Sequence, residues 1–179
     1  MPATDPHELF DVCDEPTLPL GGDPGLEAKI VSGGSTGTYN IDKENNLTEL
    51  ECGSYVFMDT AYFAVGSKSG ESNYSDFGGS LTVLTTVDSK RHKNVATIDY
   101  GNKALARPTD QVKGMPWLQV ANQGAEYGAL KWDDAGRDLK LGERVEIYCT
   151  NLDMSTNCYD RYYIAKGNDI IDAWPIMGR

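Results

Sequence analysis

The chain has 179 residues and a formal net charge of -11. This length suffices for one domain with a real core, so the sequence predicts one compact unit. The negative charge argues against a general nucleic-acid or anionic-membrane binder, because the field of the protein would repel phosphates and acidic headgroups. Small molecules or other proteins are the expected partners.

The N-terminal part of the chain lacks a regular pattern. Residues 1–25 hold five of the eight prolines and the Gly21-Gly22 pair. Prolines and glycines interrupt helices and strands, so this range is predicted to be an irregular or partly helical lead-in. It has neither the basic nor the apolar region of a signal peptide, and no apolar run approaches the roughly 20 residues of a membrane span. A cytoplasmic location and no membrane contact are therefore expected.

A glycine-rich segment follows the lead-in. Ile30 to Ser32 reads as a short strand, and residues 33–38, the glycine loop, read Gly-Gly-Ser-Thr-Gly-Thr. Glycines reach left-handed dihedrals and let the backbone approach a ligand, while the serine and threonine hydroxyls offer further donors. The loop lacks the lysine of a P-loop and the spacing of a dinucleotide fold. It predicts a phosphate-binding turn, and a plain surface loop is the alternative that these residues leave open.

The rest of the chain is rich in Val, Ile, Thr and Tyr between turn residues, a pattern typical of short strands. Turn signals such as 67–70 and 166–168 separate the runs. This cadence predicts a mainly β fold, an antiparallel β-barrel or sandwich. Leu81 to Val87 is expected to be a central strand with both faces mostly covered. The predicted strands are Ile30 to Ser32, Ser54 to Met58, Leu81 to Asp88, Val95 to Asp99, Glu126 to Trp132, Arg144 to Cys149, Tyr159 to Ala165 and Ile170 to Ala173.

The four cysteines are Cys13, Cys52, Cys149 and Cys158. They are widely separated and form no C-x-x-C pair, so their spacing suggests neither a zinc site nor a disulfide framework. Reduced thiols are expected.

Seven sequence blocks in a fixed order give the chain a resemblance to a known family. The first block contains the glycine loop, and the others follow it in the order and approximate spacing of the D-threonine aldolase and D-serine dehydratase-like family, which includes the 3-hydroxy-D-aspartate aldolases. The blocks are Val31 to Tyr39, Thr48 to Leu50, Gly53 to Asp59 with Tyr62, Leu81 to Val87, Thr97 to Leu105, Gly124 to Gly128 and Trp174 to Ile176.

The resemblance implies a pyridoxal 5'-phosphate enzyme of the alanine-racemase type (fold type III). In such enzymes an (α/β) barrel carries the cofactor and a β-domain closes the site. This chain resembles only the C-terminal part. Residues 1–25 would be the lead-in, residues 26–42 a remnant of the last barrel strand with its phosphate loop, and residues 43–179 the D-serine dehydratase-like C-terminal β-domain.

The resemblance also implies which residues would hold the cofactor. The expected phosphate contacts are Gly34, Ser35, Thr36 and Gly37. The Schiff-base lysine of the family lies in an Arg-x-His-x-Lys-x-His-Lys context, and nothing in this chain matches it. The segment of this chain most similar to that motif, Lys90 to Lys93, lacks its spacing and is expected to be a solvated, hairpin-like turn. Lys103 matches a family lysine that does not bind the cofactor, so a structural or surface role is expected.

The resemblance also implies a divalent-metal site. In family members, this site lies in the sequence motif His-Cys-Asp-Pro-Thr-x-Asn-x-Tyr-Asp, in which the His and the first Asp are ligands. The counterpart runs from Asn151 to Asp160, with Asn151 at the histidine position and Asp153 at the aspartate position. On extended backbone, residues i and i+2 lie on one face, so the two side chains are expected to point the same way. An amide oxygen replaces imidazole poorly for zinc or manganese. A weak or lost metal site is expected, and ordinary loop residues are the alternative.

In the resembling enzymes, the cofactor draws electrons from a β-hydroxy-D-amino acid and the metal binds its hydroxyl. The residue sequence of the glycine loop and the aspartate at position 153 favour retro-aldol cleavage, to glycine and an aldehyde, over dehydration. Without the lysine and with Asn151, the chain is expected to be inactive alone. An N-terminal barrel partner or a homodimer is expected, and a truncated gene, a split subunit and a pseudoenzyme all remain open.

The alternative is a degenerate, non-catalytic β-domain that binds a protein or a small phosphorylated ligand. The missing lysine and Asn151 favour this alternative. In either case, a barrel strand without its barrel would leave backbone groups and the side chains of Ile30 and Val31 without partners. Residues 1–40 are therefore predicted to be poorly ordered or docked on the β-domain.

Overall fold

The computed structural model describes residues 29–42, 44, 47–65, 75–105, 111–133 and 136–178. These residues form two units, where the sequence predicted one. Unit 1 contains the described residues of ranges 1–56 and 62–78, and unit 2 those of ranges 57–61 and 79–179. The predicted lead-in and the predicted turn at 67–70 lie outside the described residues. Within the described part of the chain, no helix has the length and apolar character needed to cross a membrane.

Unit 1 begins with a short pair of parallel strands. Strand β1 (Ser32–Gly33) pairs with β2 (Glu49–Leu50), and the carbonyl of Val31 accepts the N–H of Thr48 at 2.9 Å. The backbone from Val31 to Gly33 therefore has partners in residues 48–51, which lie in the range 43–179 predicted as the β-domain. For these residues the contacts agree with the docked alternative of the prediction. Helix α1 (Tyr39–Asp42) follows the glycine loop and lies between the two strands in sequence.

The strand predicted from Ser54 to Met58 is absent, and this prediction is wrong. Ser54–Val56 forms the 3-10 helix η2, and Thr60–Ala64 forms a second one, η3. The N–H of Val56 turns back to the carbonyl of Gly53, and the N–H of Tyr55 goes to the Thr36 hydroxyl oxygen. These donors are consequently not available to a neighbouring strand, however well the sequence suits a strand.

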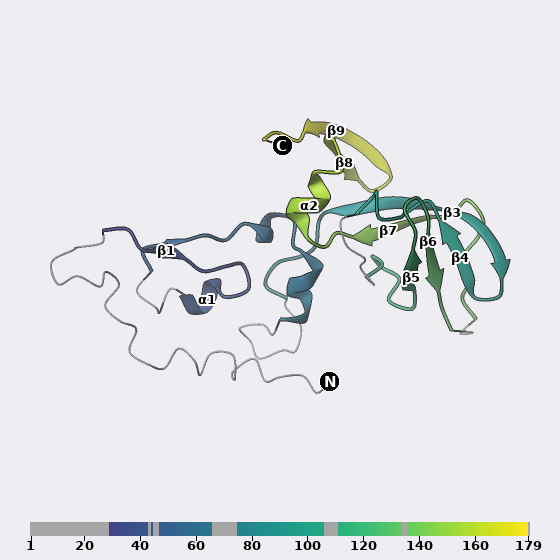
Figure 1. Cartoon of the computed structure of the whole chain (residues 1–179), viewed down its shortest axis with the longest axis horizontal. Coiled ribbons are helices and arrows are strands. Elements are labelled where there is room, and N and C mark those ends of the chain that lie inside the picture. Colours follow the sequence, from purple (N-terminus) through teal and green to yellow (C-terminus); the bar gives the residue numbers. More distant parts are fainter. Residues whose placement is uncertain are drawn as a thin grey trace. The chain divides into compact units, whose positions relative to one another are not determined.

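Unit 2 is built on a five-stranded antiparallel sheet that curls on itself, with the order β5-β6-β4-β3-β7 (Figure 1). Its strands are β3 (Thr82–His92), β4 (Val95–Ile98), β5 (Gln119–Gln123), β6 (Gly128–Lys131) and β7 (Arg144–Tyr148). Four of the five overlap predicted strands, and β5 was not predicted. Helix α2 (Leu152–Thr156) follows β7, and the hairpin β8 (Arg161–Lys166) and β9 (Asp169–Pro175) ends the described chain.

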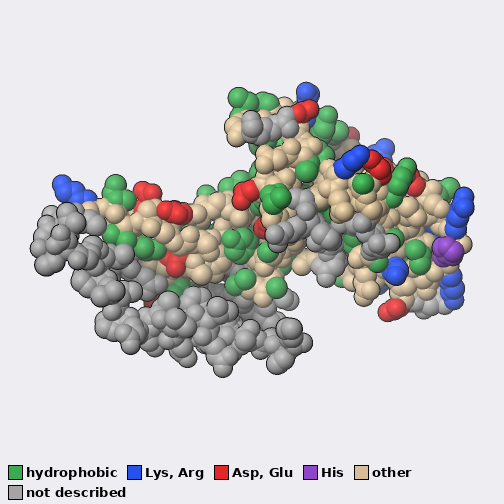
Figure 2. Space-filling view, viewed as in Figure 1, with side chains coloured by type: hydrophobic (Ala, Val, Ile, Leu, Met, Phe, Trp, Pro, Cys, Tyr) green, Lys and Arg blue, Asp and Glu red, His purple; other side chains and the backbone are tan. Residues whose placement is uncertain are grey.

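Strand β3 is covered on one face only, which corrects the prediction for Leu81 to Val87. Thr85 and Val87 are buried, whereas Leu84, which precedes Thr85 and lies on the opposite face of the strand, is 59% exposed. The strand also continues to His92, so Lys90 lies within it and the turn is formed by Lys93 and Asn94. Basic and histidine side chains gather at the tip of this β3–β4 hairpin (Figure 2).

The β8–β9 hairpin exposes large hydrophobic side chains. All residues of β9 are exposed, including Ile170, Ile171 and Trp174, and Tyr163 of β8 is exposed as well. Its turn at Gly167 lies where the sequence predicted one. Figure 2 shows hydrophobic side chains over this part of the surface.

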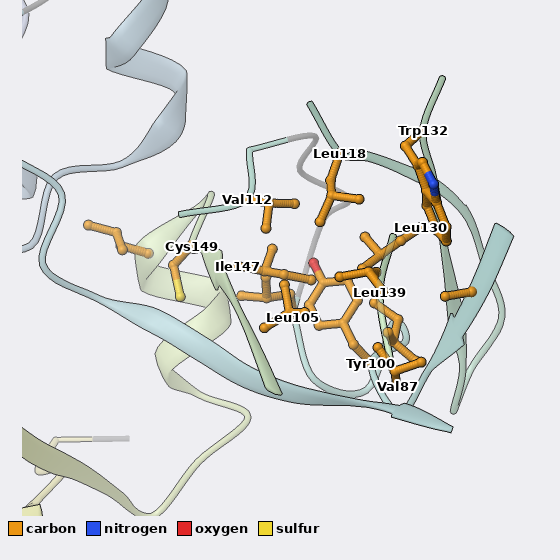
Figure 3. Close-up of a cluster of buried hydrophobic side chains, with 14 residues drawn as sticks. Val87, Tyr100, Leu105, Val112, Leu118, Leu130, Trp132, Leu139, Ile147 and Cys149 are labelled. Atoms are coloured by element: carbon orange, nitrogen blue, oxygen red, sulfur yellow. The ribbon is translucent and has the colours of Figure 1, made fainter. Parts of the chain in front are cut away.

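The core of unit 2 lies on the concave side of the sheet (Figure 3). Buried side chains converge there from β3, β4, β6 and β7 and from the segments around residues 105, 112–118 and 139. Each fully buried aliphatic or aromatic side chain contributes about 1.5–3 kcal/mol. Cys149 and Leu152 belong to this cluster. The core therefore anchors both ends of the segment that contains Asn151.

Candidate functional site

The glycine loop connects β1 to α1 and has the backbone that its glycines predict. Gly34 adopts a φ of +82°, a left-handed value that favours glycine. A Cβ atom at Gly34 would lie 2.3 Å from the Oδ2 atom of Asp42. Glycine is thus required here both for its dihedral angles and because a carboxylate lies against its backbone.

Asp42 accepts hydrogen bonds from the glycine loop. Its Oδ2 atom accepts the N–H of Ser35 at 3.3 Å and also the hydroxyl of Thr38. The Thr38 oxygen lies 3.1 Å from the same N–H, and the Ser35 hydroxyl oxygen accepts the N–H of Gly37 at 3.2 Å. Several loop donors therefore point at acceptors of the loop itself and of α1.

Thr36 is not available at the surface of the glycine loop. Its side chain is buried, and its oxygen accepts the N–H of Tyr55 at 3.1 Å. The Cys52 thiol donates to the carbonyl of Ser35 at 3.2 Å. Burial, and then the nearby Asp42 carboxylate, raise the pKa of Cys52, so the group stays a thiol at neutral pH.

These contacts define how well the loop suits a phosphate group. The left-handed Gly34, the small Gly37 and the neighbouring hydroxyls have the shape of a phosphate turn. However, the Ser35 N–H and the Thr38 hydroxyl hold a carboxylate, which would repel a phosphate bound to the same donors. Of the four expected phosphate contacts, Ser35 and Gly37 already donate their N–H groups to acceptors of the loop and of α1, so a phosphate would have to replace these acceptors.

The segment 151–153 is not extended, which corrects the geometry expected for Asn151 and Asp153. Asn151 has φ 49° and ψ 66°, and it is the N-cap of α2, with its side chain accepting the N–H of Met154 at 3.4 Å. Asp153 lies in the first turn of that helix. Asparagine tolerates left-handed dihedrals and is a favoured N-cap, so a local backbone preference overrides the extended conformation. A shared face for the two side chains no longer follows from their spacing.

Asp59 is a residue of this region that the sequence analysis did not single out. Its carboxylate accepts the N–H of Leu152 at 3.1 Å and the Thr150 hydroxyl at 3.3 Å. Asp59 is buried. Burial of Cys149, and then the nearby Asp59 carboxylate, raise the pKa of Cys149 to about 12. Asp59 ends one of the seven matched blocks, which was the signal available in the sequence.

The described residues do not fit a zinc or manganese centre. Among them, no three His, Cys, Asp or Glu side chains lie close enough together to hold an ion. Asn151 offers one neutral oxygen that already caps α2, and Asp153 offers a single exposed carboxylate. Such a pair suits at most a weakly bound, mostly hydrated hard cation.

The two lysines weighed as cofactor ligands have structural partners. Lys90 pairs with Asp138 at 2.6 Å, also bonds the carbonyl of Leu139, and lies 5.9 Å from the ring centroid of Trp132. Lys103 forms an ion pair with Glu126 on the surface. Cys52, Cys149 and Cys158 are free thiols, as predicted for the described cysteines.

The fold defines a class of protein. The chain is mainly β, with a curled antiparallel sheet preceded by a short strand and a glycine loop, and it corresponds to the C-terminal β-domain of fold-type III pyridoxal phosphate enzymes. An alanine-racemase-like protein from Idiomarina loihiensis shares this fold, with a TM-score of 0.64 over 84% of this chain and 44% of that chain, at 22% identity.

Within that class, the chain is similar to the C-terminal part of the D-threonine aldolase and D-serine dehydratase-like family. Residues 80–165 match the family described as "Putative serine dehydratase domain". The 3-hydroxy-D-aspartate aldolase of Paracoccus denitrificans is 28% identical over 88% of this chain and 41% of its own length. The D-threonine aldolase of Filomicrobium marinum superposes with a TM-score of 0.74 at 26% identity, over 84% of this chain and 42% of that chain.

The chain therefore spans about two fifths of the length of these relatives, 41% of the first and 42% of the second.

Proposed function

We propose that this chain is the C-terminal portion of a lyase that depends on pyridoxal 5'-phosphate and a divalent metal. Its substrate would be a β-hydroxy-D-amino acid, cleaved to glycine and an aldehyde. The observation that carries the proposal is the glycine loop followed by a curled β-domain, in the same order as in relatives named as aldolases. A cytoplasmic location, predicted above, stays part of the proposal.

The glycine loop would hold the cofactor phosphate through Gly34, Ser35, Thr36 and Gly37, with the phosphate replacing the present acceptors of the Ser35 and Gly37 N–H groups. Bound pyridoxal phosphate supplies an electron sink for cleavage next to the amino group. The lysine that anchors it has no match in these residues, so a barrel domain would supply it. This chain by itself is therefore proposed to be inactive.

The β8–β9 hairpin supports the proposal of a barrel partner. Its exposed Ile170, Ile171 and Trp174 form the kind of apolar surface that proteins cover with a partner. A two-stranded hairpin is marginally stable alone, so such residues gain from a second surface. The relatives have more than half of their length outside the matched part, and we assign the hairpin to a barrel domain of that kind.

The test is reconstitution with the barrel region of the Filomicrobium marinum D-threonine aldolase. The full chain and its Asn151→His variant are mixed with that barrel, pyridoxal phosphate and Mn²⁺, and glycine release from D-threonine is measured. Activity is expected only in the mixtures and chiefly with Asn151→His, because the native Asn151 and Asp153 suit at most a weakly bound cation and imidazole binds Mn²⁺ better than an amide does. Cleavage by the isolated chain, or a complex with bound cofactor that releases no glycine, would contradict the proposal.

A second candidate function is a non-catalytic β-domain that binds a protein or a small phosphorylated ligand. The observation that favours it is that the Asn151 side chain caps α2, so this side chain has a structural role instead of the role of a metal ligand. Borohydride reduction of the isolated chain with pyridoxal phosphate, followed by digestion, separates the two. A specifically labelled lysine would exclude the non-catalytic function.

A further inference from the structure

Asp59 is a buried acidic residue whose hydrogen-bond partners are all neutral groups. The residue is only 6% exposed. Its carboxylate accepts the N–H of Ala61 at 2.9 Å, the N–H of Leu152 at 3.1 Å and the hydroxyl of Thr150 at 3.3 Å. All three donors are neutral groups. Hydrogen bonds rather than an ion pair therefore offset the cost of burying this carboxylate, and removing it would leave buried donors without a partner.

The backbone before Asp59 is strained. Met58 is fully buried and has a φ of 63°, which is rare for a residue with a long side chain. Such strain persists only where surrounding contacts enforce it. Here the contacts are on both sides, because the Phe57 carbonyl accepts the N–H of Ser80 at 2.9 Å and the Thr60 N–H reaches the carbonyl of Cys149 at 3.2 Å. The strained turn therefore directs the Asp59 carboxylate at the segment after β7.

The two groups that Asp59 binds in that segment flank a single residue. Thr150 precedes Asn151 and Leu152 follows it, and Asn151 between them has the left-handed φ of 49°. Leu152 is also buried in the core, and the Ser155 hydroxyl donates to the carbonyl of Thr150 at 2.6 Å. With both neighbours held, the direction of the side chain at 151 is fixed.

We propose that Asp59 is a positioning residue that fixes the left-handed backbone of residue 151 and so aims whatever side chain stands there. The inference rests on the proposed function in one respect, that position 151 is where a metal ligand belongs in this family. The hydrogen bonds from Thr150 and Leu152 to Asp59, which we call the clamp, are independent of the metal, because they join protein groups alone. Asn151 therefore occupies a backbone position that is held on both sides, and its side chain caps α2 there.

The test compares Asp59→Asn and Asp59→Ala, each in the native chain and together with Asn151→His. Asp99→Ala is the matched control, because Asp99 is another carboxylate of unit 2 that accepts a threonine hydroxyl and an N–H, from Thr85 and Thr86, both at 2.6 Å. Circular dichroism verifies that each variant is folded. Should Asp59→Ala not fold, Asp59→Asn, which keeps the shape and one oxygen acceptor, carries the test.

The first readout is the backbone itself, by NMR of the chain without metal. In the Asp59 variants, the ¹³Cα shift of residue 151 is expected to leave the left-handed range and the Leu152 amide to exchange at least about tenfold faster, the loss of a hydrogen bond worth about 1.4 kcal/mol. Asp99→Ala is expected to change neither. An unchanged shift and unchanged exchange in both Asp59 variants would overturn the proposal.

The second readout is the affinity of the Asn151→His variant for Mn²⁺, measured by calorimetry. Adding Asp59→Asn is expected to weaken binding by about tenfold or more, a typical effect of losing a group that orients a ligand, whereas adding Asp99→Ala leaves it unchanged. Equal affinities with and without Asp59 would refute its aiming role. If Asn151→His binds no Mn²⁺ while the NMR changes occur, the metal part of the proposed function fails and the clamp stands.

Discussion

Thr36 shows at the residue scale how the glycine loop is held. The loop has the glycines and hydroxyls of a ligand-binding turn, yet this hydroxyl is buried and receives the N–H of Tyr55. Asp42 similarly receives the Ser35 N–H and the Thr38 hydroxyl. Polar side chains that the sequence offers for ligand binding are thus partly used to hold the loop in one conformation. The loop is therefore pre-organised before any ligand binds.

Replacing Thr36 with valine tests this anchoring role. Thr36→Val keeps the shape of the side chain but removes the acceptor of the Tyr55 N–H, so that amide is expected to exchange with water about tenfold faster for a bond worth about 1.4 kcal/mol. Hydrogen exchange followed by NMR or mass spectrometry measures the change. Thr156→Val removes a threonine hydroxyl of unit 2 that donates to the carbonyl of Asp153 at 3.1 Å, and it should leave the Tyr55 amide unaffected. Equal protection of Tyr55 in the Thr36 variant would contradict the anchoring role.

At the scale of elements, the curled sheet depends on close backbone contacts that its glycines permit. A Cβ atom at Gly128 in β6 would lie 2.5 Å from the carbonyl oxygen of Tyr100, in the chain just after β4. Gly128 stands opposite Ile98 in the β4–β6 register. A side chain at this position would separate the two strands, because the atom it meets is backbone.

We therefore expect Gly128→Ala to lower the free energy of unfolding by about 1–3 kcal/mol, the usual cost of overpacking. Urea unfolding followed by tryptophan fluorescence measures the loss, since Trp117 and Trp132 lie in unit 2. Gly124→Ala is the control, because its nearest neighbour is the Tyr127 oxygen at an ordinary 3.5 Å. Equal losses in the two variants would argue against the close approach as the cause.

Strand β7 carries an ion pair with a predictable pH dependence. Lys113 lies 2.7 Å from Glu146, and its hydrogen bond, aided by the Thr82 hydroxyl and opposed by partial burial, lowers the pKa of Glu146. A carboxylate with a lower pKa when folded stabilises the protein above its unfolded pKa and loses this effect as the pH falls through its folded pKa. The contribution is small, below about 1 kcal/mol, because both side chains are partly exposed.

Lys113→Gln is accordingly expected to reduce stability above about pH 5 and to match the native protein in acid, where Glu146 is protonated. Urea midpoints measured from pH 3 to 7 show the convergence. Lys103→Gln, which breaks the more exposed Lys103–Glu126 pair, is the comparison and should change the midpoints less. A constant difference across the pH range would mean that Lys113 acts by packing rather than by charge.

Several elements were predictable because their residues carry the pattern locally. Strands β3, β4, β6, β7, β8 and β9 overlap their predictions, since their β-branched and aromatic residues lie between turn residues. Strand β5 was missed because its sequence, Gln-Val-Ala-Asn-Gln, has weak strand preference and forms by pairing with β6. The 3-10 helix at Ser54–Val56 was missed for the opposite reason, because a distant threonine takes a donor of a strand-like sequence.

At the scale of the whole molecule, the described chain keeps an exposed apolar hairpin. Ile171 of β9 is 61% exposed, and its neighbours along the strand are exposed as well. A charge in the middle of such a surface opposes any apolar partner without disturbing a buried core. The hairpin thus offers a direct test of the proposed barrel contact.

Ile171→Glu is expected to weaken binding of the Filomicrobium marinum barrel by about tenfold or more, the effect of losing a central interface residue. Analytical ultracentrifugation of the mixed chains measures the affinity. Leu141→Glu changes a similarly exposed leucine before β7, 68% exposed, and should leave binding unaltered. If the isolated chain self-associates and Ile171→Glu abolishes that association instead, the hairpin belongs to a second copy and the assignment to a barrel is wrong.

The sequence by itself determined the class, because the order of its blocks and the spacing of its turns are properties of the chain. The mainly β fold and the similarity to the C-terminal part of aldolase-like enzymes are both confirmed. The missing lysine motif and the asparagine at 151 were equally visible. The tertiary structure decided how the candidate residues are used, namely Asn151 as a left-handed cap, Thr36 as a buried anchor, and Asp42 and Asp59 as acceptors for distant groups. These roles depend on hydrogen bonds between residues up to 93 positions apart, which no local pattern records.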